Sequence, residues 1–237
     1  MQLKKMVLEH PRNTKIEFDV KNHKYYYKKT VRSKVEEFTG VTGWIGSYCE
    51  PFQRDKIATN YGKRYGMSKQ EVLDLWQGDQ DYGSRVHLSI ENLVKFGIID
   101  DSVELEYFME ALAQENLVPI DCEWVVYDEE IKKASPIDLI CERDDKLVVV
   151  DIKTMKKPIR YTPYGNANKK MVYPLNGLPD SKFYKQNLQT NIYRYWLNKH
   201  YNVPVDLTSY IFRINDQGWE VLPCLELSNY VEKMYNE

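Results

Sequence analysis

The chain has 237 residues, of which 43% are hydrophobic and 29% charged, and its formal net charge is −2. This composition provides enough apolar side chains for a packed core and excludes a wholly disordered chain. No apolar run approaches the ~18 residues of a membrane span, and the N-terminal segment is polar rather than signal-like. A cytoplasmic protein with no membrane partner is therefore expected.

The first half of the chain predicts a hairpin followed by helices. Residues 15–20 alternate in polarity and are followed by a polar turn and a tyrosine-rich run at 24–27, which predicts a β-hairpin within a lead-in segment, 1–50. Segment 51–118 predicts helices at about 52–65, 82–96 and 102–116. A separate short helix is expected to begin at Ser68, because Ser68 and Glu71 have the spacing of a capping box.

The second half, 119–237, changes to the period of β-strands. Three consecutive strands are predicted at 120–127, 134–142 and 146–154, with a polar turn at 143–146. An irregular segment at 155–180, a helix at 181–200, short strands near 207–214 and 219–223 and a C-terminal helix complete the chain. The sequence has no repeat and no linker, which indicates one domain. The element order predicts an α/β (α+β) fold, with a central mixed sheet flanked by helices.

The cysteines are far apart in the sequence and form no C-x-x-C motif; they are Cys49, Cys122, Cys141 and Cys224. Reduced and mostly buried thiols are expected. A cluster ligated by four distant cysteines is the alternative.

The strand predicted at 146–154 ends in a carboxylate and an ammonium group. Side chains alternate along a strand, so Asp151 and Lys153 share one face. Asp138 lies on the preceding strand at a comparable distance from the turn, so it is expected close to Asp151. Carboxylates this close repel unless a cation bridges them, and Mg²⁺ or Mn²⁺ suits phosphate chemistry. Lys153 is then placed to orient a water molecule or to hold a charged phosphate. The alternative is a salt-bridged strand end.

Further candidates for this site lie on earlier elements. Gly83, His87 and Glu91 share one helical face, which makes His87 a candidate imidazole ligand and Glu91 a candidate support for it. A structural role for a lone helical histidine is the alternative. Glu123, on the strand before Asp138, is a candidate second carboxylate, and the alternative is an exposed strand charge.

The late helix offers polar groups for a substrate. Gln189 and Tyr193 share one helical face, and Gln186 precedes them. These side chains are candidates for hydrogen bonds to a phosphate or a base edge. Their alternative is a helix-packing pair.

Ten Lys or Arg residues and a single acid, Asp180, occur between residues 152 and 199, which leaves the rest of the chain acidic. Within 155–179 basic residues are interleaved with tyrosines and there is no acid. Lysines can follow a phosphate backbone while tyrosines stack on bases, so this segment predicts a channel for single-stranded nucleic acid. A solvated surface loop is the alternative. The candidate contacts are Lys156, Lys157, Arg160, Tyr161, Tyr164, Lys169 and Lys170.

Taken in order, these motifs resemble those of a nuclease superfamily. The sequence has G-x-x-x-H-x-x-x-E at 83–91, Glu123, S-P-I-D-L-I at 135–140, V-V-V-D-I-K-T at 148–154 and Q-x-x-x-Y at 189–193. This order resembles the PD-(D/E)XK superfamily, and within it the RecB-like exonuclease branch of phage recombination nucleases and the mitochondrial genome maintenance exonuclease. The resemblance extends over about 41–197. Pro136 is separated from Asp138 by Ile137, so the literal Pro-Asp pair is absent.

The resemblance implies a restriction-endonuclease-like core and a catalytic site. Within that site His87, Asp138 and Asp151 would hold Mg²⁺ or Mn²⁺, and Lys153 would be catalytic. The resemblance also implies that Gln189 and Tyr193 are supporting substrate contacts. Iron–sulfur members of the branch carry a tight C-terminal group of cysteines, whereas this chain has one cysteine in that region, so no cluster is expected.

The activity that the resemblance implies is that of a metal-dependent DNA exonuclease in replication, recombination or repair. Free or single-stranded DNA ends are the expected substrate, in a bacterial or phage-infected cell. A recombination or replication protein is a candidate partner. One rival is a structure-specific or RNA-cleaving endonuclease of the same fold. The other is a nucleic-acid-binding or inhibitory protein without turnover.

Overall fold

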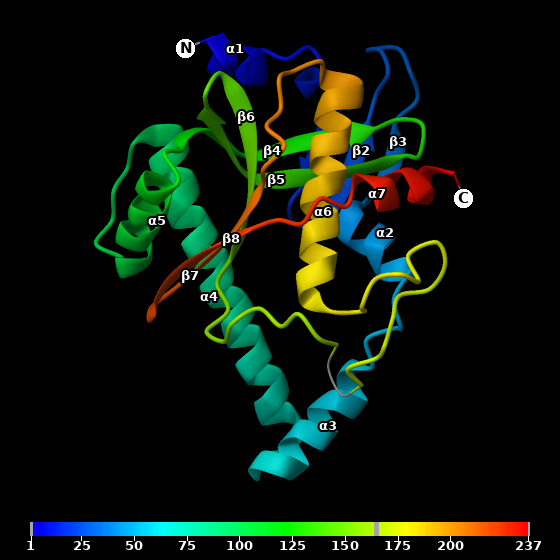
Figure 1. Ribbon diagram of the computed structural model, residues 1–237, viewed down its shortest axis with the longest axis vertical. Helices are drawn as coiled ribbons and strands as arrows, with labels where there is room; N and C mark the ends of the chain where they lie inside the picture. The colour runs from blue at the N-terminus through cyan, green and yellow to red at the C-terminus, as the bar shows by residue number, and fades with distance from the viewer. Residues whose placement is uncertain (1, 164–165, 237) are drawn as a thin grey trace.

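A mixed β-sheet forms the centre of the molecule in the computed structural model, which describes residues 2–163 and 166–236 (Figure 1). The strand order is β1-β2-β3-β5-β6-β7-β8, and β4 pairs with β5. The strands are β1 (Ile16–Asp19), β2 (Lys24–Tyr27), β3 (Glu36–Gly40), β4 (Val118–Asp128), β5 (Lys133–Arg143), β6 (Lys146–Lys153), β7 (Tyr210–Asn215) and β8 (Gly218–Pro223).

Antiparallel hairpins build this sheet, and two parallel pairings join them. The hairpin β1–β2 continues into β3, and β4, β5 and β6 form an antiparallel meander. Strand β3 pairs in parallel with the beginning of β5, and β6 pairs in parallel with β7. Connections of this kind produce the mixed sheet that the sequence predicts, so the α/β (α+β) fold class is confirmed.

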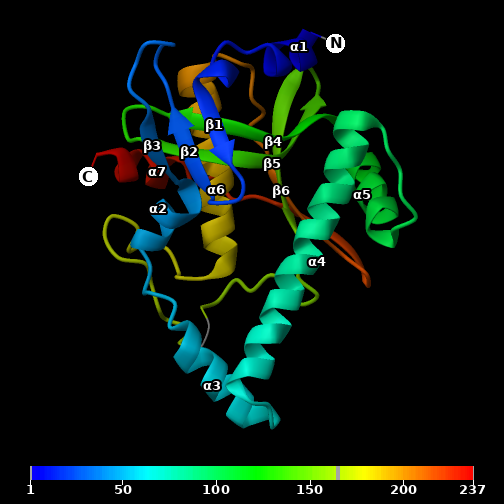
Figure 2. The same ribbon diagram turned by 180° about the vertical axis from the view of Figure 1, so that it is seen from behind.

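Helices cover both faces of the sheet (Figures 1 and 2). On one face, α1, α2, α6 and α7 pack on a core that includes Leu147 and Val149 of β6. On the other face, α4 and α5 pack on Val148 and Val150. Both faces of β6 are therefore buried, which accounts for its apolar run. The helices are α1 (Gln2–Leu8), α2 (Val41–Ser47), α3 (Arg54–Tyr65), α4 (Lys69–Phe96), α5 (Val103–Gln114), α6 (Lys182–Trp196) and α7 (Ser228–Tyr235).

The expectation of two separate helices after residue 68 is wrong. Helix α4 is continuous over 28 residues, although Ser68 caps its start with the expected capping box with Glu71. Neither Gly78 nor Gly83 interrupts it, because glycine costs only about 1 kcal/mol in a helix and no proline removes a hydrogen bond. Side-chain hydrogen bonds one turn apart, such as the 2.7 Å bond from Gln70 to Asp74, support this stretch.

Other elements differ from prediction mainly at their ends. The hairpin β1–β2, the meander β4–β6, the irregular segment after β6 and the last two strands lie where the sequence predicts them. The sequence does not predict α1, which is only seven residues long and has two buried side chains, Leu3 and Val7, and it predicts neither the short strand β3 nor the short helix α2. The helix predicted at 181–200 ends at Trp196 and continues as a π-turn at Leu197–Tyr201.

The thiols lie in separate apolar clusters. Cys49 packs with α2 and α6, Cys122 and Cys141 pack under α4 and α5, and Cys224 packs near Phe183. Burial raises the pKa of Cys122 to about 12 and that of Cys49 to about 11, which keeps both thiols protonated. Among residues 2–163 and 166–236, no helix has the length and apolar character required to cross a bilayer.

Candidate metal centre

Two aspartates meet where β5 and β6 run side by side. Leu139 pairs with Val150 in this antiparallel ladder, which sets Asp138 opposite Asp151. The backbone N–H of Ile152 donates a 2.8 Å hydrogen bond to Oδ2 of Asp138. The register that follows from the short turn at 143–146 therefore brings the two carboxylates together, as the sequence predicts.

Lys153 links these two carboxylates. Its Nζ lies 2.7 Å from Oδ2 of Asp151 and 3.5 Å from Oδ2 of Asp138. It also donates a 3.0 Å hydrogen bond to the carbonyl of Ile152. Burial alone would lower the pKa of Lys153, but the charges of Asp151 and Asp138 outweigh it and raise the pKa above its ordinary value. The side chain is thus a fixed ammonium group at neutral pH.

Asp151 is the most deeply placed acid of the group. Its side chain is 1% exposed; Oδ2 lies 2.7 Å from the ammonium of Lys153, whereas Oδ1 has no hydrogen bond among the described residues. Burial raises the pKa of Asp151 to about 6 against the opposing charge of Lys153, and the charge of Asp138 adds to the rise. Lys153 neutralises this buried carboxylate through Oδ2, and the unsatisfied Oδ1 leaves one oxygen able to accept a further cation or donor.

For Asp138, the effects that lower the pKa outweigh the effect of burial, in contrast to Asp151. Burial would raise its pKa, but Lys153, His87 and the backbone N–H of Ile152 lower it below the ordinary value. Asp138 is therefore ionised at neutral pH. Its Oδ2 takes the Ile152 hydrogen bond, and its side chain remains 12% exposed toward the opening of the site.

Helix α4 and strand β4 supply the remaining ligands. Nδ1 of His87 lies 3.4 Å from Oε1 of Glu123. Glu123 lies between the Cys122–Leu139 and Trp124–Ile137 pairs, which sets it opposite Asp138 in the β4–β5 register. Its φ is +51°, a left-handed conformation that costs on the order of 1–3 kcal/mol in a residue other than glycine. Strain of this kind is retained where the surrounding structure requires the side chain in one place.

His87, Glu123 and Asp138 form the most compact group of ligand atoms in the described part of the chain. One nitrogen or oxygen from each lies within 4.8 Å of the other two. Burial would lower the pKa of His87, but Glu123 and Asp138 raise it further than burial lowers it. Mixed nitrogen and carboxylate donors suit Mn²⁺ and accept Mg²⁺. The site predicted from the sequence has His87, Asp138 and Asp151 as ligands, whereas here Glu123 joins the compact group and Lys153 holds Asp151.

Gly83 brings α4 close to the end of β6. A Cβ at this position would lie 3.0 Å from Oγ1 of Thr154, closer than side chains normally pack. His87 follows one helical turn later, so this close approach sets the height of His87 over Asp138. The sequence places Gly83 and His87 on one face, but the contact with Thr154 has no signal in the sequence.

Glu91 does not support His87. It pairs with Lys95 one turn further along α4, with 2.7 Å between Nζ and Oε1. Glu123 takes the place next to His87 instead. The i, i+4 pair on the helix forms at lower entropic cost than a contact that would require Glu91 to reach back along its own face.

The polar residues of α6 lie inside the protein. Tyr193 is 1% exposed, and its hydroxyl makes hydrogen bonds of 2.7 Å with Gln189 and 2.8 Å with Ser135 of β5. Gln186 is 8% exposed. Burial corrects the interpretation of Tyr193 and Gln186 as direct substrate contacts, since both are enclosed. Through its bond to Ser135 of β5, Tyr193 is a support that holds α6 against the strand of Asp138.

Ion pairs occupy part of the basic segment after β6. Lys156 pairs with Asp216 at 3.0 Å, and Lys169 pairs with Glu50 at 2.6 Å and with Asp180 at 3.0 Å. These contacts correct the expectation that both lysines are available to a polyanion, because their charges are already matched by acids from distant parts of the chain.

The rest of the predicted channel is more open. Tyr161 is 55% exposed and its ring lies 4.2 Å from that of Phe183. Lys157, Arg160 and Lys170 are exposed. Tyr164 lies outside the described residues. In its described part the segment thus has two exposed aromatic rings, Tyr161 and Tyr173, and four exposed cations, of which Lys156 is already in an ion pair.

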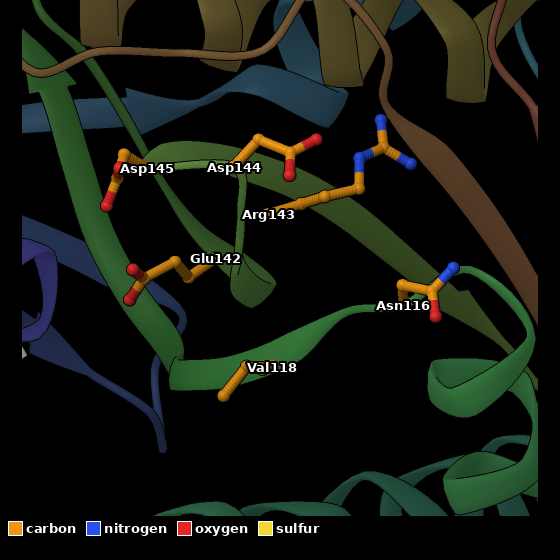
Figure 3. Close-up of a pocket in the computed structure, with 6 residues that line it drawn as sticks. All are labelled: Asn116, Val118, Glu142, Arg143, Asp144 and Asp145. Atoms are coloured by element: carbon orange, nitrogen blue, oxygen red, sulfur yellow. The ribbon is translucent and has the colours of Figure 1, made fainter.

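A surface hollow of about 640 Å³ lies at the other end of the β5–β6 hairpin (Figure 3). Five residues separate Asp138 from the turn, which is ~17 Å of extended strand, so the hollow is distinct from the candidate metal centre. Its lining is mainly acidic, with one basic residue, Arg143, that already contacts Tyr210 and Asp206, so no ligand is assigned to it. The lining residues are Asn116, Val118, Glu142, Arg143, Asp144 and Asp145.

Comparison with known proteins adds little to this geometry. No protein-family model matches the chain, and no curated protein matches it. A solved structure described as the crystal structure of SSO0001 has 14% sequence identity and a TM-score of 0.37, over 83% of this chain and 72% of that chain. Similarity at this level carries no argument about the site, so the function proposed below depends on the residues described above.

Proposed function

We propose that the protein is a metal-dependent nuclease of the PD-(D/E)XK type that hydrolyses phosphodiester bonds in DNA. The observation that carries this proposal is the compact group of His87, Glu123 and Asp138 beside a lysine that contacts Asp138 and Asp151. The motif order read from the sequence supports it. A protein that binds nucleic acid without cleaving it has no need for these four ionisable groups, whose placement costs desolvation and backbone strain.

The donor set fits a divalent cation. His87, Glu123 and Asp138 would hold it, and the unsatisfied Oδ1 of Asp151 fits a position close to it. Such an ion, when bound, supplies Lewis acidity to a phosphodiester and relieves the repulsion between the carboxylates. Exposure rises from Asp151 at 1% to about 30% for His87 and Glu123, so substrate would enter from the side of α4 and β4.

Lys153 has the position of a catalytic group. In hydrolysis, water adds to phosphorus, the bond from phosphorus to the leaving oxygen breaks, and negative charge grows on the phosphoryl oxygens. The ammonium of Lys153 is fixed by two carboxylates and by the carbonyl of Ile152, so it needs no reorganisation to stabilise that charge. The carboxylates of the group orient the water and accept its proton.

The proposed substrate is DNA with free ends, and the proposed activity is exonucleolytic. The exposed cations and Tyr161 of the segment after β6 support a flexible, single-stranded end. A recombination or replication protein is the proposed partner, in the cytoplasm of a bacterial or phage-infected cell. An endonuclease of the same fold would use the same residues, so the form of the DNA must separate the two.

The test is digestion of matched linear single-stranded, linear duplex and circular single-stranded DNA with Mg²⁺, Mn²⁺ or EDTA. Metal-dependent loss of linear DNA, with circles intact, is expected. Glu123→Gln should abolish this loss, while the matched control Glu142→Gln, near the other end of the β5–β6 hairpin, should leave it unchanged. Cleavage of circles would indicate an endonuclease. No cleavage of DNA or RNA with either metal would refute the nuclease.

A further inference from the structure

The loop between β2 and β3, residues 28–35, is the most basic exposed loop without matching acids in the described chain. Between residues 21 and 34 the sequence has six Lys or Arg residues and no acid. Among the described residues, only Lys24 of these six forms an ion pair, at 2.9 Å from Glu37. Within the loop, Lys28, Lys29, Arg32 and Lys34 form no ion pair among the described residues, and all are exposed. Lys21 lies in the β1–β2 turn, at the other end of β2.

The acids nearest in sequence do not compensate this charge. Glu36 pairs with Lys132 at 2.6 Å, and Glu37 pairs with Lys24. By contrast, six of the ten basic residues at 152–199 form ion pairs with acids. A cation that already has a carboxylate partner releases fewer counterions when it meets a phosphate. The β2–β3 loop has four cations without an ion pair within eight residues, and is therefore a denser patch of available positive charge than the 48-residue segment at 152–199.

The loop holds a defined shape. The backbone N–H of Ser33 donates a 3.0 Å hydrogen bond to the carbonyl of Thr30, and Thr30 N–H donates a 3.1 Å bond to Oγ of Ser33. The backbone N–H of Lys28 donates a 2.8 Å bond to the carbonyl of Lys15, which adds a further cation at the base. A preformed turn loses less entropy on binding than a disordered one.

The position of the loop relates it to the candidate metal centre. Strand β3 is parallel to β5 and pairs with it through Gly40 and Ala134, so the loop lies beyond the beginning of β5. Roughly ten residues of extended strand separate the level of Lys34 from Asp138, which is on the order of 30 Å. Figure 1 shows the loop at the end of the molecule opposite α3. It is too far away to touch the reacting phosphate but is within reach of a long strand.

We propose that the β2–β3 loop is a second nucleic-acid-binding surface, which holds the phosphate backbone of DNA away from the cleaved end. The choice of DNA as its occupant depends on the function proposed above. The loop has no aromatic side chain to stack on bases, so it contacts phosphates without regard to sequence. Lys28, Lys29 and Arg32 make the contacts.

The test compares two variants with the same change in net charge. The loop variant is Lys28→Glu, Lys29→Glu and Arg32→Glu together. The control reverses exposed lysines on other elements, Lys4→Glu, Lys146→Glu and Lys233→Glu. Binding of a labelled single-stranded oligonucleotide and of its duplex is measured by fluorescence anisotropy in EDTA, over a series of salt concentrations, after circular dichroism has confirmed the fold.

The loop variant should bind both DNA forms about tenfold or more weakly, and its log K against log salt slope should fall by about 2 for the single strand. The control should stay close to the unmodified protein. Equal losses in both variants, or wild-type binding by the loop variant, would overturn the proposal. So would loop-dependent binding to anionic phosphatidylserine vesicles with unchanged DNA binding. Loop-dependent DNA binding without cleavage in Mg²⁺ or Mn²⁺ would refute the proposed nuclease activity but would still support the loop as a DNA-binding surface.

Discussion

Asp128, at the end of β4, is a buried acid whose charge should stabilise the fold. It is 0% exposed. Oδ2 lies 2.6 Å from Nε2 of His200 and accepts a hydrogen bond from the hydroxyl of Tyr235, while Oδ1 accepts a 2.8 Å bond from the N–H of Glu130. Burial would raise the pKa of Asp128, but these contacts lower it to about 2.

The magnitude and sign of the effect follow from this pKa. A carboxyl group whose pKa falls from 3.8 to about 2 contributes roughly 2–3 kcal/mol to the free energy of unfolding, at ~1.4 kcal/mol per unit. Because the folded pKa is the lower one, the contribution is complete above pH 4 and is lost as pH falls toward 2. Asp128→Asn should therefore cost ~2–3 kcal/mol at pH 7 and progressively less below pH 4.

Urea unfolding of both proteins at a series of pH values measures this difference. Tryptophan fluorescence is a local reporter, because Nε1 of Trp196 donates a hydrogen bond to the Tyr235 hydroxyl. Glu130→Gln, which removes an exposed ion pair with Lys199, is the control and should change stability by less than ~1 kcal/mol. A cost of Asp128→Asn that is the same at pH 3 and pH 7, or no larger than that of the control, would refute the reasoning.

Three further predictions concern the candidate metal centre. Asp138→Asn and Asp151→Asn should abolish cleavage. In EDTA at pH 7, Asp151→Asn should also raise the melting temperature. The folded-state pKa of Asp151 is raised to about 6, so ionisation of this group destabilises the folded protein as pH rises from 4 through 6. A lower melting temperature would contradict this. Lys153→Ala should lower turnover ~10²-fold or more with oligonucleotide binding retained, and equal losses of both would make it a phosphate anchor. Gly83→Ala should weaken Mn²⁺ binding in calorimetry, whereas Gly78→Ala, where no atom approaches within 4 Å, should not, and unchanged binding in both would remove Gly83 from the argument.

The sequence predicts the part of the site that depends on local geometry. Asp138, Asp151 and Lys153 lie on one hairpin, and the period of a strand together with a short turn is enough to bring them together. The mixed sheet follows from the order of strand and helix patterns. These features need only contacts between residues that are close in sequence.

The rest depends on contacts between distant segments. The position of Glu123 requires a left-handed residue that no propensity marks. Lys156 and Lys169 look available in the sequence, and their partners Asp216 and Glu50 lie far away along the chain. The burial of Tyr193 follows from how α6 packs on the sheet, so a helical face alone could not separate a substrate contact from a support.

The length of α4 has a mechanical consequence for the site that it serves. The helix is ~42 Å long, and ~21 Å of it precede Gly83. Its N-terminal part extends with α3 beyond the sheet (Figure 2). Between Val72 and Val86 this helix buries no side chain, so it first packs against the sheet near Gly83. If the helix pivots there, a 3 Å swing at its outer tip moves His87, ~6 Å beyond the pivot, by less than ~1 Å. The N-terminal part of α4 can thus move to accommodate a bulky polymer while the imidazole of His87 keeps its position beside Glu123 and Asp138.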